Sequence, residues 1–483
     1  MKKENIMFKM LLIMSFITLA YIIPKVYFQN DTFYSIKIGE SILKNGVDMI
    51  DHFSWIPNLA YTYPHWLFDV IIYLIHNSFG NFGIYIFVIL SFLSLICLMY
   101  YVCKKLTNDK YISFIVTLFA SIALRDFAAA RAQLLTYPLL LFILFSIYRL
   151  RETDNKKHII SIFISSLLIA NMHVAVWPFV FVLFMPFVVS DIIYLITKKL
   201  NYDVPRHFNI DIEKSKLKIT SLALLSCFIT GFMTPNFLVP FTYYIKTAMG
   251  ISTSNISEHI PITISGNEFI FILLLIVVIL LLNKKSKIKL NDLFLLCGLF
   301  LLAFLSKRNS FLLVILGSIP IARLFKNVSF FDLKIVIMNR IFYCILFVIM
   351  LSSFLVVFSR TKYKYIDTDY YPKKAVDYIK ENIDLDNSKI FNEYNYGSYL
   401  MLRGIKVFVD SRADLYLEEF NKDCHIFEDF IYLDDNYDEI FKKYGVTHVL
   451  LSNGNKVHKY MKNDNGYKKL YKDSNFTIYE VLN

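Results

Sequence analysis

The chain has 483 residues, of which 56% are hydrophobic, 17% aromatic and 19% charged, and its mean hydropathy is +0.49. Soluble globular proteins are about 45–50% apolar and about 25% charged, so this composition excludes a soluble globular enzyme and indicates a polytopic membrane protein. The net charge of +12 falls mainly in short loops between apolar segments, which is typical of membrane orientation signals and does not indicate nucleic-acid binding.

Eleven apolar runs approach the length of about 20 residues that a membrane-spanning helix needs. We predict spans at about 7–23, 82–102, 111–129, 133–150, 158–172, 175–197, 218–234, 268–283, 289–306, 309–324 and 341–358. The first run lacks a small-residue cleavage site, so we interpret it as a retained helix and not as a secretory signal.

The loop charges predict the orientation of these spans. With the N-terminus in the cytoplasm, the inner loops hold 24 Lys and Arg residues and the outer loops hold 8, as the positive-inside rule requires. Residues 65–76 are apolar but too short to span and include Asp69, so we expect an interfacial or re-entrant helix on the outer side. If this segment did span, every later loop would change sides.

After the last run the pattern changes to short helices and strands with turn residues between them. We expect helix 373–382 and strands at 388–392, 406–410, 447–452 and 476–481. The chain is therefore predicted to have a transmembrane domain, residues 1–359, and a small extracytoplasmic α/β domain, residues 360–483, with a linker at 359–371.

The first outer loop, residues 24–81, is rich in acids and histidines, among them Asp31, Asp51 and His65. Apolar residues at helical spacing over 32–44 predict an interfacial helix with Asp31 as its N-cap. Asp31 either only caps that helix or acts as a general base, because a carboxylate beside a low-dielectric surface gains proton affinity and can activate a hydroxyl. Asp51 is either a second such carboxylate or the start of a turn.

Glu258 and His259 form a second candidate group in the outer loop 235–267. They are either a solvated pair or a support for the base or for a divalent cation, with Asp31 as a further oxygen ligand. Acids so far apart in sequence leave the metal unknown. His173 lies at a tight outer turn, where a hydrogen-bonded buried histidine is favoured over a metal ligand.

Four cations end outer spans and could bind the phosphate of a lipid-linked substrate: Arg125, Arg131, Lys307 and Arg308. Arginine binds phosphate through two parallel hydrogen bonds, and charges at membrane depth are functional candidates. The alternative is that each side chain only extends to the head groups from a helix end. Nucleotide-binding and common hydrolase motifs are absent from the sequence.

These residues suggest a family. Asp31 opening DTFYSIKIGESILKNG, then DMIDHFSW and YPHWLFDVIIY, resembles the first outer loop of the GT-C glycosyltransferases, polytopic enzymes related to dolichyl-phosphate-mannose protein mannosyltransferases. ANMHVAV (170–176), TPNF (234–237), ISEHIP (256–261) and the run at 390–416 look like landmarks of a bacterial branch. The likeness covers nearly the whole chain, through single residues in order.

The resemblance implies an inverting transfer of a sugar from a polyprenyl-phosphate donor to an envelope glycan, lipid or protein on the outer face. Asp31 corresponds to the catalytic carboxylate, and Asp51 and Glu258 are carried over with it. Many members have a second acid beside the first, where this chain has Thr32. The alternatives are a transporter or flippase of lipid-linked intermediates, against which the nearly uncharged spans weigh, and a catalytically inactive GT-C-like scaffold.

Overall fold

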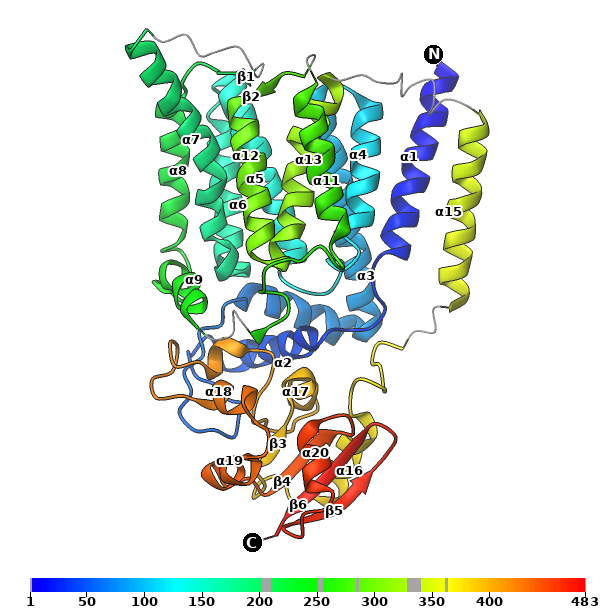
Figure 1. Cartoon of the computed structure of the whole chain (residues 1–483), viewed down its shortest axis with the longest axis vertical. Coiled ribbons are helices and arrows are strands. Elements are labelled where there is room, and N and C mark those ends of the chain that lie inside the picture. The colour runs from blue at the N-terminus through cyan, green and yellow to red at the C-terminus, as the bar shows by residue number, and fades with distance from the viewer. Residues whose placement is uncertain are drawn as a thin grey trace. The chain divides into compact units, whose positions relative to one another are not determined.

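The computed structural model describes residues 2–201, 210–250, 255–283, 286–327, 340–360 and 364–482. The chain divides into two compact units (Figure 1). Unit 1 consists of Met1–Lys25, Tyr85–Phe241 and Ser257–Lys362, and unit 2 of Val26–Ile84, Thr242–Ile256 and Tyr363–Asn483.

Unit 1 is built mainly from helices. Its helices are α1 (Lys2–Ile22), the second part of α3 (Trp66–Thr107), α4 (Lys110–Ala123), α5 (Gln133–Thr153), α6 (Lys157–Met172), α7 (Pro178–Lys199), α8 (Leu217–Thr230), α11 (Glu268–Leu282), α12 (Leu290–Leu305), α13 (Ser310–Asn327) and α15 (Arg340–Arg360). The largest helix contacts join α5 to α6, α12 to α13, α6 to α8 and α13 to α4. Strands β1 (Ile210–Asp211) and β2 (Ile288–Lys289) pair in parallel at one end.

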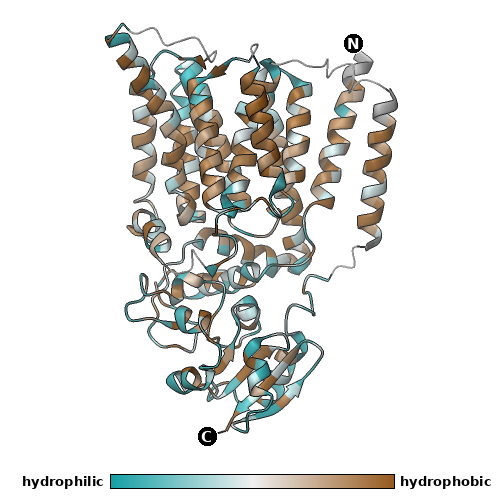
Figure 2. Cartoon of the chain, in the orientation of Figure 1, coloured by the Kyte–Doolittle hydropathy of each residue, from teal (hydrophilic) through white to brown (hydrophobic). Residues whose placement is uncertain are grey.

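The helices have the composition of membrane-spanning segments. Among the described residues, four helices are long and apolar enough to cross a membrane and seven more are apolar but shorter. Hydrophobic residues run along these helices and hydrophilic ones gather near their ends (Figure 2). The chain is therefore a multi-pass membrane protein, while the number of spans and their orientation stay predictions.

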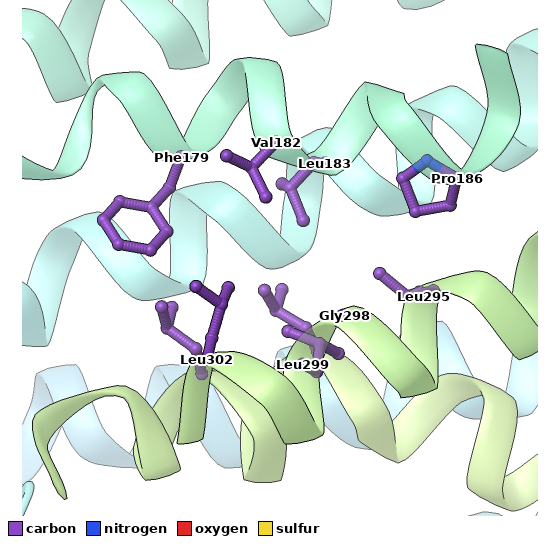
Figure 3. A pocket seen from close by; sticks show the side chains of 10 residues that line it. Phe179, Val182, Leu183, Pro186, Leu295, Gly298, Leu299 and Leu302 are labelled. Atoms are coloured by element: carbon purple, nitrogen blue, oxygen red, sulfur yellow. The ribbon is translucent and has the colours of Figure 1, made fainter. Parts of the chain in front are cut away.

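One small cavity lies among the helices of unit 1. A cavity of about 30 Å³ lies between α7, α12 and α13, and Figure 3 shows the apolar side chains that line it. Gly298 of α12 faces this space, because a Cβ added there would have no atom within 4 Å. Such a cavity has room for about one water molecule but offers it no polar partner.

Helix α3 is interrupted at Gly80, whose φ of 61° and ψ of −159° are not helical. Glycine has no Cβ and adopts this conformation at little cost. The break falls between the segment 65–76 and the run 82–102, which the sequence also separates. The interfacial position of the first part stays a prediction.

Unit 2 contains a four-stranded mixed sheet. Its strands β3 (Ile390–Asn392), β4 (His448–Ser452), β5 (Tyr467–Lys472) and β6 (Phe476–Val481) lie in the order β3-β4-β6-β5, with β3 and β4 parallel and the other pairs antiparallel. Its helices are α2 (Asn30–Asn45), the first part of α3, most of α9 (Val239–Met249), α16 (Lys373–Asn382), α17 (Tyr394–Leu402), α18 (Ile426–Ile431), α19 (Tyr437–Tyr444) and α20 (Lys456–Met461). The expected mixture of short helices and strands is confirmed.

The strand predicted at 406–410 is wrong. Its backbone pairs with the first loop and not with the sheet, since the Val407 amide donates to the Phe53 carbonyl at 3.0 Å and the Trp55 amide donates to the Val407 carbonyl at 3.3 Å. The Asn392 side chain hydrogen-bonds the next backbone groups of this segment. It accepts from the Phe408 amide at 2.9 Å and donates to the Val409 carbonyl at 2.7 Å. The strand β5, which the sequence did not indicate, forms the sheet edge instead.

The first loop and the C-terminal region fold together. Helix α2 packs on α17, and Phe33 of α2 contacts the rings of Tyr371 and Tyr399 with centroids 5.0 and 5.4 Å away. The indole of Trp55 donates to the Ile390 carbonyl at 2.9 Å. The boundary predicted at residue 360 concerns where the spans end and stays a prediction.

Candidate functional site

A charged cluster lies in unit 1 where α4 leads into α5, α6 into α7 and α12 into α13. Arg131 donates from Nη1 to both carboxylate oxygens of Glu258, at 2.9 and 3.0 Å. The Arg131 side chain is 20% exposed and that of Glu258 is 41% exposed. The structure thus joins one predicted phosphate ligand to one predicted carboxylate.

The backbone around Glu258 is fixed by the turn between α12 and α13. The Glu258 carbonyl accepts from the Arg308 amide at 3.0 Å and from the Ser306 hydroxyl at 3.1 Å. The Lys307 amide donates to the Ile260 carbonyl at 3.0 Å. These bonds hold the Glu258–Ile260 segment along the start of η3 (Lys307–Asn309).

Arg308 points its guanidinium at neutral groups. Its Nη2 donates to Gln133 Oε1 at 3.1 Å and lies 3.4 Å from His173 Nε2. Because an arginine can only donate, Nε2 is the acceptor, and the proton of neutral His173 is on Nδ1, which lies 3.3 Å from the Thr136 hydroxyl. His173 and Gln133 are buried, so they orient Arg308 without neutralising it.

His259 adds no charge to this cluster at neutral pH. Burial, together with the positive charge of Arg308, lowers the pKa of the His259 imidazole to about 4. The cluster then has two guanidinium groups against one carboxylate. Its surplus of positive charge, with neutral donors and acceptors around it, is suited to an anionic ligand.

Arg125 and Lys307 are exposed at the same end of unit 1. Asp126 pairs with Lys25 at 2.9 Å, and not with the adjacent Arg125. The hydrogen bond from Lys25 lowers the pKa of the Asp126 carboxyl, and the charges of Arg125 and Lys307 act in the same direction. Both cations are therefore near Asp126 and open to solvent.

Asp31 lies in unit 2, in the first turn of α2. The helix begins two residues earlier than predicted, with Gln29 at the N-cap and no side-chain cap, so the prediction that Asp31 is the N-cap is wrong. An acidic residue in the first turn still interacts favourably with the helix dipole. The pKa of Tyr371 is raised well above its ordinary value by burial, and the negative charge of Asp31 contributes.

The backbone around Asp31 is anchored on both sides. Asn30 donates from Nδ2 to the Tyr394 carbonyl at 2.8 Å, and the Tyr371 hydroxyl donates to the Phe28 carbonyl at 3.1 Å. Asp31 itself is partly exposed. A half-exposed carboxylate on a fixed helix start can be presented to a substrate with little rearrangement.

Asp51 is buried in an ionic network of unit 2. Its Oδ1 accepts from Arg412 Nη1 at 2.6 Å, and both side chains are 1% exposed. Arg412 also donates to Asp410, at 2.6 Å from Nη2. The Asp51 Oδ2 accepts from the Ser54 amide at 2.8 Å. This hydrogen bond forms the turn that the sequence offered as the alternative role of Asp51.

His65 is the remaining candidate of unit 2. Its Nδ1 lies 3.2 Å from the Tyr34 hydroxyl, and the imidazole is partly exposed. Its carbonyl accepts from the Asp69 amide at 3.0 Å in the first turn of α3. These contacts fit a residue that joins α2 to α3.

No three His, Cys, Asp or Glu side chains among the described residues are close enough together to hold a metal ion. Glu258, one of the two acids considered for a divalent cation, is bound to Arg131. The divalent cation considered from the sequence stays a prediction, and no step below involves one.

Sequence reasoning missed Gln133, Thr136, Asp410 and Arg412. Gln133 had a weak signal, since it is a polar residue at the start of an apolar run. Asp410 and Arg412 lie in the quoted run 390–416, but the Asp51–Arg412 pair joins residues 361 positions apart, and no local pattern shows such a contact.

Comparison with known proteins rests on structure. No family model and no curated protein matches the chain. Fifteen chains of solved structures match, among them the apo crystal structure of the Archaeoglobus fulgidus oligosaccharyltransferase, with a TM-score of 0.55 and 12% sequence identity. The match covers 92% of this chain and 69% of the archaeal one. At this identity the likeness shows the fold alone: the chain has a fold like that of the archaeal oligosaccharyltransferase, which agrees with the resemblance drawn from the sequence.

Proposed function

We propose that this protein is a membrane glycosyltransferase that transfers a sugar from a polyprenyl-phosphate-linked donor to a cell-envelope acceptor on the outer face, with inversion at the sugar carbon. The observation that carries the proposal is Arg308, a partly buried cation on a GT-C-like fold whose described partners are neutral. Other partly or fully buried arginines with described side chains all have a carboxylate within 3.0 Å: Arg131, Arg149, Arg151, Arg323, Arg403 and Arg412.

Arg308 is the proposed ligand of the donor phosphate. Gln133 and His173 hold its guanidinium in place, and the positive surplus of the cluster favours a group with one or two negative charges. Arg131 is the proposed second contact, and Glu258 orients it through two hydrogen bonds. Arg125 and Lys307, both exposed, attract the anion without fixing its position.

Asp31 is the proposed general base that takes the proton of the acceptor hydroxyl. The proposal rests on the family resemblance, on the partial exposure of Asp31 and on the anchored backbone on either side of it. Asp51 is assigned a structural role, because a carboxylate that is 1% exposed and bound to Arg412 cannot reach a substrate without breaking that pair.

The test is incubation of the purified, detergent-solubilised protein with a panel of polyprenyl-phosphate sugars, with release of free lipid phosphate as the readout. Asp31→Asn should fold normally and lower the rate by about 10²–10⁴-fold, the usual contribution of a general base. Arg308→Ala should weaken donor binding by about 10–100-fold, which is the loss of one charged hydrogen bond to the ligand.

Arg149→Ala is the matched control for Arg308→Ala. Arg149 is partly exposed and pairs with Glu152, at 2.7 Å, at the other end of the helices. Unchanged donor affinity in Arg308→Ala would make that residue a structural contact of His173. Full activity in Asp31→Asn would remove it as the base, and no turnover of any donor by folded protein would favour the transporter or the scaffold.

A further inference from the structure

A second charged region lies at the opposite end of unit 1, where α5 ends, α12 begins and α13 ends. It contains a cavity of about 200 Å³ that is open to solvent on one side. Four basic residues line it, namely Lys287, Lys289, Arg323 and Lys326, together with Glu152 and Asp292. A cavity of about 150 Å³ is enough to hold a benzene molecule, so this one has room for a phosphate group and part of its substituent.

The acids of the cavity are already neutralised. Arg323 donates to both oxygens of Asp292, at 2.9 and 3.1 Å, and the Tyr148 hydroxyl donates to Asp292 at 2.6 Å. The Arg323 guanidinium also lies over the Tyr148 ring, 4.3 Å from its centroid. Glu152 accepts from Arg149 at 2.7 Å. These groups form a fixed wall with no net negative charge.

The positive charge that remains is on lysines. Lys289 forms an ion pair with Glu213, with the two atoms 2.6 Å apart. Within the described part of the chain, Lys287 and Lys326 have no carboxylate in ion-pair distance. Their backbones are held close to each other, because Asn327 donates from Nδ2 to the Lys287 carbonyl at 2.5 Å.

Buried polar groups flank the same segment. Ser286 and Asn291 are 4% and 1% exposed, and their side-chain atoms have no hydrogen-bond partner among the described residues. Buried polar groups are normally bonded to protein, water or ligand. The chain on either side of Lys287 and Lys289 therefore has hydrogen-bonding capacity that the described residues leave unused.

We propose that this cavity binds a phosphate-bearing anion, held by Lys287 and Lys326 against the Arg323–Asp292 wall. It is separate from the Arg308 cluster, which lies at the other ends of α5, α12 and α13, so it does not depend on the proposed glycosyl transfer. The ligand is either the head group of an anionic phospholipid or a free phosphate compound. Basic pockets at helix ends of membrane proteins are suited to anionic head groups.

The experiment measures thermal unfolding of the full-length protein in detergent, at constant ionic strength, with three probes. These are inorganic phosphate, short-chain phosphatidylglycerol and phosphatidylcholine of the same chain length. We expect saturable stabilisation by phosphatidylglycerol, by phosphate or by both, and none specific to phosphatidylcholine. Stabilisation by the lipid alone assigns the head group, and stabilisation by phosphate assigns a soluble ligand.

The double variant Lys287→Gln/Lys326→Gln should raise the apparent dissociation constant at least tenfold. Lys287→Arg/Lys326→Arg, which keeps both charges, should restore most of the affinity. Lys198→Gln/Lys199→Gln is the matched control, because these exposed lysines end α7 outside the cavity and the same two charges are removed. Equal losses in the control and the double variant, or no saturable shift with any probe, would overturn the proposal.

Discussion

The ionic network around Arg412 provides a quantitative test of the role of Asp51. One buried guanidinium lies between two carboxylates: Asp51 at 2.6 Å and Asp410 at 2.6 Å. The three side chains are at most 1% exposed. The network therefore has one negative charge more than positive, and the effect of a substitution depends on which charge it removes.

Asp51→Asn removes the surplus charge. The amide oxygen can still accept one of the two hydrogen bonds of Asp51, from Arg412 or from the Ser54 amide, so the loss is about one charged hydrogen bond, or about 2 kcal/mol. Arg412→Met leaves two carboxylates facing each other without a cation and should cost about 3–5 kcal/mol or more. It also removes the cation–π contact with Tyr61, whose ring centroid is 5.0 Å away.

The assay is the midpoint of thermal unfolding together with transfer activity per folded molecule. For a domain of about 150–250 residues, each kcal/mol shifts the midpoint by about 2–4 °C, so Asp51→Asn should lower it by about 4–8 °C and Arg412→Met by clearly more. Activity of folded Asp51→Asn should stay near that of the wild type. An unchanged midpoint with lost activity would refute the reasoning and make Asp51 a functional carboxylate.

Three further substitutions test the packing and the pH response. Gly39→Ala should destabilise unit 2 by about 2 kcal/mol or more, because the new Cβ would lie 2.1 Å from the Asp69 carbonyl oxygen. Gly298→Ala has open space around the new Cβ and should be neutral or stabilising by about 1 kcal/mol. Similar midpoints of thermal unfolding for the two variants would contradict this reasoning. His259 has a folded pKa of about 4, below its unfolded value of about 6.5, so the unfolded chain binds the proton first and stability should fall between pH 7 and pH 5 by about 2 kcal/mol. His259→Gln should remove that part of the pH dependence. If the unfolding midpoints of the variant and the wild type changed with pH in the same way, the burial of a neutral imidazole would be contradicted.

The sequence predicted what depends on local pattern. Apolar runs, which are set by the thickness of a bilayer, located the helices of unit 1, and the apolar spacing over 32–44 located α2 within about two residues. Helix α16 matches its predicted range, 373–382. Such elements are specified by residues that are near one another in the chain.

The errors concern groups whose partners are distant. Residues 406–410 have the apolar composition of a strand, but their backbone bonds with Phe53 and Trp55, which no neighbouring residue indicates. Asp51, for which the sequence left a catalytic role and a turn both open, is paired with Arg412. In both places the competing interaction comes from more than 300 positions away, so local reasoning could only leave the alternatives open.

The same comparison of partners separates Arg308 from an ordinary structural arginine. A guanidinium taken out of water is stabilised mainly by a carboxylate, as Arg131, Arg323 and Arg412 show in this chain. Neutral groups such as Gln133 and His173 orient a cation but compensate little of its lost hydration. If Arg308 only supported His173, Arg308→Gln would keep that hydrogen bond and improve stability. If Arg308 binds phosphate, Arg308→Gln would be at least as stable as the wild type but would lose donor affinity. A stability that is kept or increased together with weakened donor binding therefore separates a ligand contact from a packing contact.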